Sequence, residues 1–150
     1  MNMESKTKAK VRQDRYNKTE KGKTTNQRKQ YRYGETVKGR AFVLYASAKQ
    51  RAEKRNLPFS ITQSIVEEKL RDCHHTCEIT GTPLSFEKHK SARQNPFAPS
   101  LDQKVAGDGY TPNNIQIVAF WYNRMKSDLT DSEAVQILLE SNTGIQQLHG

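Results

Sequence analysis

The stretch S-L-D-Q-K-V-A-G-D-G-Y-T-P-N-N-I-Q-I-V-A-F-W-Y-N, from Ser100 to Asn123, decides the fold that this sequence predicts. Two apolar segments flank a glycine-rich loop, so the pattern indicates a strand, a turn, a second strand and then a helix. Leu101 is expected to point into the core. Because side chains alternate along a strand, Asp102 then points the other way, toward a cleft.

The helix that follows has an apolar stripe at helical spacing, and Asn123 lies one residue off that stripe, where it can face the hairpin. Asp102 and Asn123 can therefore converge and offer oxygen ligands to a hard cation such as Mg²⁺ or Mn²⁺. We expect Asn114 to hold the hairpin backbone. Spacing alone therefore predicts a basic DNA-binding protein with a metal site formed by Asp102 and Asn123.

These residues resemble a known family. The S-x-D of residues 100–102, the G-Y-T-x-x-N of residues 109–114 and the helical Asn123 are similar to the pattern of small phage-type HNH endonucleases. R-A-E-K-R-N-L-P-F-S-I-T at 51–62 and C-E-I-T-G-T-P-L at 77–84 extend the resemblance over about residues 38–129. It implies a ββα-metal core and a metal-dependent DNA endonuclease, a phosphodiester hydrolase that nicks one strand or cuts both. In such an enzyme the cation stabilises the charge that develops on cleavage, and Arg124 or Lys126 would grip the scissile phosphate. It also implies a phage-encoded protein acting in the cytoplasm of a bacterial host, with Asp102, Gln103, Asn114 and Asn123 as the catalytic set.

Gln103 departs from the standard HNH pattern, which places a histidine directly after the aspartate as the general base. Glutamine cannot accept a proton at neutral pH. Two interpretations stay open: a cation-polarised water or another residue (His74, His75 or His89) supplies the base, or the site is slow or inactive. The alternative function is therefore a non-enzymatic DNA-binding protein on the HNH scaffold, and a third is an RNA-binding protein.

The net charge of +9 is concentrated at the N-terminus, since residues 1–40 hold 13 Lys and Arg against 4 Asp and Glu. Two near-copies of a nonapeptide, R-Y-N-K-T-E-K-G-K at 15–23 and R-Y-G-E-T-V-K-G-R at 32–40, lie there. Thr19 and Thr36 are predicted helix N-caps. We interpret the segment as a DNA-binding arm that is weakly ordered alone; a solubilising tail is the alternative. The expected DNA contacts are Arg15, Tyr16, Lys21, Lys23, Arg32, Tyr33, Lys38 and Arg40.

Residues 36–72 predict a helical pair that connects the arm to the core. One stripe runs from Val37 to Ala52, the helix ends near Asn56, and Thr62 caps a second helix to about Arg71. Residues 59–61 predict a short strand between them. The basic end of the first helix is either a further DNA contact or a solvated terminus.

Cys73 and Cys77, with two histidines between them, resemble one half of a zinc-binding site. In zinc-bearing HNH relatives the other half lies on the final helix, at the places that Ala119 and Tyr122 hold here. We therefore expect no structural Zn²⁺. Cys77 is instead expected to pack in the core and to begin a β-hairpin that extends to Phe86.

Thr130 to Glu133 is a capping box that predicts a C-terminal helix packed on the back of the core, followed by a frayed tail. With 33% apolar residues and no apolar run long enough for a membrane span, the chain predicts one small domain with no membrane partner. The fold class is α+β: an arm at 1–35, a helical unit at 36–72, an HNH-like core at 73–140 and a tail at 141–150. We expect a monomer or a weak homodimer.

Overall fold

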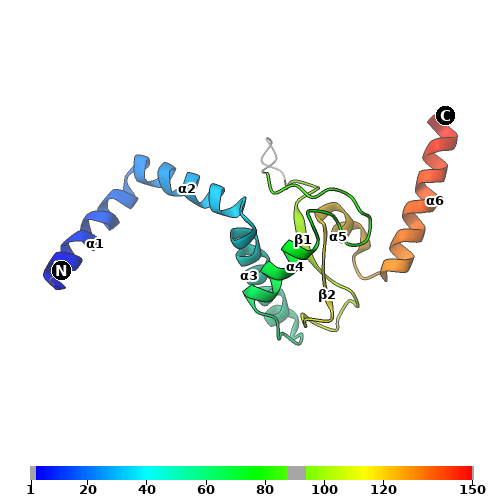
Figure 1. Ribbon diagram of the computed structural model, residues 1–150, viewed down its shortest axis with the longest axis horizontal. Coiled ribbons are helices and arrows are strands. Elements are labelled where there is room, and N and C mark those ends of the chain that lie inside the picture. Colours follow the sequence, from blue (N-terminus) through cyan, green and yellow to red (C-terminus); the bar gives the residue numbers. More distant parts are fainter. Residues whose placement is uncertain (1–2, 88–93, 150) are drawn as a thin grey trace.

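The structure is a computed structural model that describes residues 3–87 and 94–149 (Figure 1). Its mixture of helices with an antiparallel sheet confirms the predicted α+β class. In the described part of the chain the elements are α1 (Met3–Lys18), α2 (Glu20–Gly34), α3 (Val37–Arg55), α4 (Gln63–Asp72), β1 (Pro99–Gln103), β2 (Ile115–Ala119), α5 (Phe120–Lys126) and α6 (Asp131–His149). None of the helices in these residues is long and apolar enough to cross a membrane.

The sheet lies at the centre of the core. β1 and β2 pair antiparallel, with Asp102 opposite Gln116, and every residue of β2 is buried. The outer edge of β2 is closed by Glu78, whose N–H donates to the Ile117 carbonyl at 3.0 Å and whose carboxylate accepts the Ile117 N–H at 2.7 Å. A single residue thus satisfies the backbone that a third strand would otherwise pair.

The predicted hairpin from Cys77 to Phe86 forms only in part: the turn at Gly81 is present, but the extended strands are not. Residues 78–80 form a turn before Gly81, at φ +68°, and among the described residues of this segment the ladder consists of one isolated bridge, between Thr76 and Pro83. Across the turn the Cys77 N–H donates to the Thr82 carbonyl at 2.8 Å and the Leu84 N–H donates to the His75 carbonyl at 2.7 Å. Glu78, within the turn, bonds to β2. The predicted strand at 59–61 is likewise one bridge, between Phe59 and Tyr110.

The helical pair forms as predicted. The Thr36 hydroxyl accepts the Gly39 N–H at 3.0 Å at the start of α3, and Asn56 ends that helix in the left-handed conformation at φ 54°. Thr62 caps α4 by accepting the Ile65 N–H at 3.3 Å. Small residues of α3, such as Ala41 and Ala48, allow the two helices to approach closely. The buried side chains of the pair are Ala41, Leu44, Ala48, Ala52, Val66 and Leu70.

The basic arm contains two helices, α1 and α2, where the sequence predicted little order in the absence of DNA (Figure 1). The two repeats form the two joints between α1, α2 and α3. In each joint a threonine hydroxyl accepts the N–H of a buried glycine three residues on, at 3.0 Å: Gly22 for Thr19 and Gly39 for Thr36. Both predicted N-caps are confirmed. A Cβ on Gly22 would lie 1.9 Å from the Tyr16 carbonyl oxygen, so the first joint requires glycine.

The C-terminal helix differs from expectation in length and in packing. The capping box is confirmed, since Thr130 and Glu133 exchange hydrogen bonds at 2.8–3.3 Å. However, α6 continues to His149, so the described part of the predicted tail, residues 141–149, is helical. Ala134 is buried, whereas Leu139 and Leu148 are 64% and 80% exposed, and α6 leads away from the core (Figure 1). Helix α6 therefore packs through its first turns, and its remaining length does not cover the core as predicted.

Candidate active site

The site lies where β1 meets α5. Helix α5 follows β2 directly, and its N-cap residue Ala119 provides no side-chain hydrogen bond. The loop before β1 replaces that cap: the carbonyls of Ala98 and Pro96 accept the N–H groups of Phe120 and Trp121, both at 2.9 Å. The start of the helix is thereby held against the start of the strand, which brings Asn123 and Lys126 over Asp102.

Asp102 is 7% exposed and belongs to a buried polar network. Its Oδ2 accepts hydrogen bonds from Lys126 Nζ at 2.8 Å and from Gln116 Nε2 at 2.9 Å. Gln116 also donates to both carboxylate oxygens of Asp131, at 3.1 and 3.0 Å. The Tyr122 hydroxyl donates to Asp131 Oδ1 at 2.7 Å. Burial and the neighbouring Asp131 carboxylate raise the pKa of Tyr122, so its hydroxyl keeps the proton that it donates.

Lys126 was predicted to grip a phosphate, and this prediction is wrong. Its side chain has no exposed surface, and its ammonium is enclosed by the Asp102 and Asp131 carboxylates. The helical spacing explains the difference, because Lys126 lies four residues after Tyr122 and therefore on the buried face of α5. Arg124, the other predicted phosphate ligand, is exposed.

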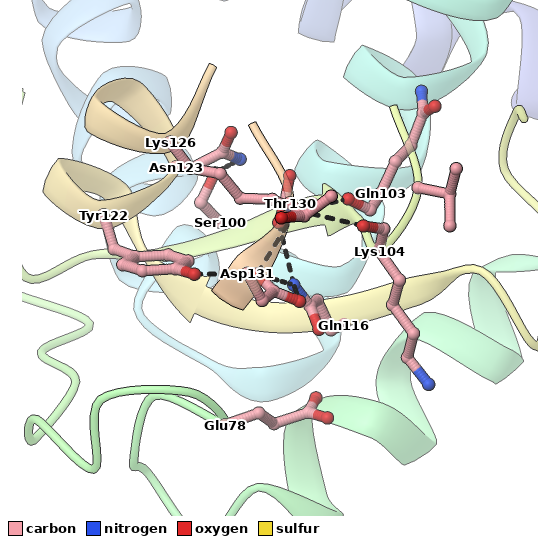
Figure 2. Close-up of polar contacts among 12 residues, drawn as sticks. Glu78, Ser100, Gln103, Lys104, Gln116, Tyr122, Asn123, Lys126, Thr130 and Asp131 are labelled. Carbon is pink, nitrogen blue, oxygen red and sulfur yellow. Dashed lines mark hydrogen bonds and ion pairs between the residues drawn. The ribbon is translucent and has the colours of Figure 1, made fainter. Parts of the chain in front are cut away.

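Asn123 is held by its amide nitrogen. Nδ2 donates to Ser100 Oγ at 2.8 Å and to the Leu101 carbonyl at 3.3 Å (Figure 2). A carbonyl can only accept, so the contact with Leu101 fixes which end of the amide faces the strand. The Asn123 Oδ1 atom and the Asp102 Oδ1 atom have no hydrogen-bond partner within the described part of the chain. Each residue thus keeps one oxygen for a ligand.

The loop between the strands is held by two side chains. Asn114 donates to the carbonyls of Val105 and Gly109, at 3.1 and 2.8 Å, and accepts the Val105 N–H at 3.0 Å. It therefore holds the hairpin backbone as predicted. The Gln103 Oε1 atom accepts the N–H groups of Gly107 and Gly109, at 3.0 and 3.3 Å. Gln103 thus has a structural role in this loop.

A cleft of about 320 Å³ opens beside these residues. Arginines from two helices reach it: Arg51 and Arg55 from the end of α3, and Arg124 from α5. Arg51 is fixed, because its Nε donates to the Tyr110 hydroxyl at 2.8 Å and its guanidinium lies 5.5 Å from the centre of that ring. The cleft is lined by Arg51, Arg55, Ser100, Leu101, Asp102, Gln103, Ala106, Gly107, Tyr110, Phe120, Asn123, Arg124, Ser127 and Asp128.

The structure brings Asp102, Gln103 and Asn123 to one cleft and adds residues that the sequence prediction did not place there. Arg51 and Arg55 were treated only as the basic end of a helix. Their spacing of four residues, which puts both on one face, was an available signal. No pattern in the sequence indicated that Asp128 lines the cleft. Asp131 was identified only as part of a capping box.

The predicted DNA contacts of the arm lie mostly on its surface. Tyr16 is 38% exposed and its hydroxyl lies 3.3 Å from the Thr25 hydroxyl. Arg40 is half-buried; burial lowers its pKa, and its enclosed Nε has no partner among the described residues. The side chain of Tyr33 lies outside the described residues. The exposed cations of the predicted set are Arg15, Lys21, Lys23, Arg32 and Lys38.

The cysteine and histidine cluster lies apart from the cleft. Cys77 packs in the core as predicted, and burial raises the pKa of the Cys73 thiol. His75 stacks edge-on against Phe86, and neither His74 nor His75 lines the cleft. His89, the third candidate base, lies outside the described residues. Across residues 3–87 and 94–149, no three His, Cys, Asp or Glu side chains are grouped so that they could hold a metal ion.

Comparison of the chain with protein-family models, with curated proteins and with solved structures finds no match.

Proposed function

We propose that this protein is a metal-dependent DNA endonuclease of the HNH type, in which β1, β2 and α5 form a ββα-metal unit. The observation that carries the proposal is the cleft itself. It places two unpaired oxygens, Asp102 Oδ1 and Asn123 Oδ1, beside three arginines. Oxygen ligands for a hard cation next to cations for a polyanion are what phosphodiester cleavage needs.

The donor set fits Mg²⁺ or Mn²⁺. These ions take few ligands from protein and complete their coordination with water and phosphate oxygens, so a carboxylate and an amide oxygen suffice. A cation bound there would polarise the phosphate and stabilise the leaving oxygen.

The other residues of the cleft have roles that follow from their positions. Arg55 and Arg124 are placed to bind the phosphate, and Arg51 is held in place by Tyr110. Among the described lining residues, Asp128 is the one carboxylate besides Asp102. We assign it the role of general base, which Gln103 cannot perform because it is an amide and bonds the loop.

The basic arm supplies affinity for DNA. Its exposed cations lie on α1 and α2 and on the joint that leads into α3, whose other end provides Arg51 and Arg55 to the cleft. Helix α3 therefore connects the phosphate-binding arm directly to the proposed catalytic cleft, and DNA bound along the arm is delivered toward it.

The test is conversion of supercoiled plasmid to open-circular or linear DNA, with Mg²⁺, Mn²⁺ or EDTA. Asp102→Asn keeps an acceptor for Lys126 while removing the charge, so the fold is expected to persist and cleavage to fall at least about 100-fold. Asp108→Asn is the matched control, because Asp108 is exposed in the same hairpin loop and does not line the cleft. Cleavage that survives in Asp102→Asn, or that is insensitive to EDTA, would contradict this site.

A DNA-binding protein without nuclease activity is the second candidate. The observation that favours it is the composition of the cleft, whose described lining residues include no histidine, and in which Gln103 is committed to the loop. Plasmid that stays supercoiled with every metal, while a DNA duplex is still bound, would establish this alternative.

A further inference from the structure

Lys126 lies inside a cage of oxygens. Its Nζ is 2.7 Å from the Gln103 carbonyl, 2.8 Å from Asp102 Oδ2, 3.3 Å from Asp131 Oδ1 and 3.4 Å from the Lys104 carbonyl. Figure 2 shows the side chain entering this cage from α5, between the end of β1 and the start of α6. Two carboxylates and two backbone carbonyls are also the ligands that a hard divalent cation takes. The ammonium thus occupies a set of oxygens suited to a metal ion.

The cage decides how Asp102 can bind a ligand. Lys126 and Gln116 both donate to Oδ2, so Oδ1 is the oxygen that remains, and the carboxylate is held in one orientation. Asp102 can therefore offer one oxygen to the cleft but not two. A fixed positive charge at 2.8 Å from Oδ2 also weakens the attraction of Asp102 for any further cation.

Asp131 holds Lys126 in place from the opposite side. It is itself fixed by Tyr122 and Gln116, and it reaches the cage because the capping box begins α6 at that point. The cluster carries two carboxylates and one ammonium, so its formal charge is −1. Removing the ammonium alone leaves two neighbouring carboxylates without a counter-ion, which proteins tolerate poorly.

Building on the proposed function, we propose that Lys126 is an internal cation that stands where a second metal ion would bind. It makes Asp102 a one-oxygen ligand and limits the site to a single, weakly held divalent cation. Asp131 is a positioning residue that acts through Lys126. Lys126 thus determines both the number of metal ions that bind and the orientation of the Asp102 carboxylate.

The test compares the wild type, Lys126→Met and the charge-preserving double variant Lys126→Met with Asp131→Asn. Mn²⁺ binding to the full chain is measured by calorimetry without DNA, and cleavage is measured separately at saturating Mn²⁺. Removing the ammonium should tighten Mn²⁺ binding at least about tenfold in Lys126→Met, because the two cations no longer repel each other. Cleavage should nevertheless fall, because Asp102 Oδ2 loses one of its two donors and the carboxylate is held only by Gln116. The double variant should bind Mn²⁺ less tightly than Lys126→Met.

Opposite changes in affinity and rate separate this role from a purely structural one. A purely structural lysine would lower thermal stability, affinity and rate together, and that result would overturn the inference, as would unchanged Mn²⁺ affinity in both variants. If a variant is too unstable for calorimetry, the rise of its melting temperature with Mn²⁺ reports the same affinity. A wild type that neither binds Mn²⁺ nor cuts DNA would refute the proposed function. If the Lys126 variants then acquired Mn²⁺ binding, that result would still support the inference that Lys126 stands where a metal ion would bind.

Discussion

Gly109 is the point at which the loop of the candidate site meets the segment before α4. A Cβ there would lie 2.3 Å from the Pro58 carbonyl oxygen and 2.9 Å from two Pro58 ring carbons, and its φ is +85°. The same contact carries two backbone hydrogen bonds, from Tyr110 N–H to Pro58 and from Ser60 N–H to Tyr110, at 2.8 and 3.0 Å. Because Tyr110 holds Arg51, this packing also determines one wall of the cleft.

Gly109→Ala should lower the free energy of unfolding by about 3 kcal/mol or more, since left-handed strain of about 1–2 kcal/mol adds to a collision with backbone. Gly107→Ala is the matched control. Gly107 lies in the same loop at φ +92°, but a Cβ there would meet nothing within 4 Å, so we expect a loss of about 1 kcal/mol from the strain alone.

The assay is urea unfolding followed by the fluorescence of Trp121, the one tryptophan of the chain, which is half-buried on α5. Because a small domain is stable by about 5–15 kcal/mol, the two variants should be clearly separated. If Gly109→Ala and Gly107→Ala differ by less than about 0.5 kcal/mol, the segment at Pro58 yields to the new methyl group, and the reasoning from close packing is refuted.

Three further predictions concern the arm and the helix caps. Thr36→Ala removes the N-cap of α3 and should cost about 1 kcal/mol in urea unfolding, with Thr36→Ser as the variant that keeps the hydroxyl. Deleting residues 1–35 should weaken DNA binding and reduce the slope of log affinity against log salt by about 0.9 for each phosphate that the arm neutralises in the full chain; an unchanged slope would mean that the arm is a passive tail. Hydrogen bonds from the Thr130 N–H and hydroxyl lower the pKa of Glu133, so its contribution to α6 is present above the ordinary carboxyl pKa of about 4.3 and is lost as the pH falls through the lowered value. The helix content of residues 131–149, followed by NMR, should therefore fall in acid, and Glu133→Gln should remove that pH dependence.

Residues that are close together in the sequence determined the helix caps, the helical stripes and the hairpin loop of this protein. The caps at Thr19, Thr36, Thr62 and Thr130 were predictable because each hydroxyl accepts an N–H only three residues away. The role of Asn114 was predictable for a similar reason, because the groups that it bonds lie within nine residues. Helical stripes and the alternation of β1 likewise depend only on neighbouring positions.

Tertiary structure decided what no local pattern contains. Glu78 pairs with Ile117, 39 residues away, a contact that no pattern near Glu78 predicted. Arg51 reaches Tyr110 across 59 residues, which brings α3 to the cleft. Lys126 is a basic residue near the end of a short helix, and its sequence neighbourhood is the same whether it faces DNA or the core. Only the arrival of Asp102 and Asp131 from other segments makes its burial favourable, because a buried ammonium is stable only among oxygens that pair with it.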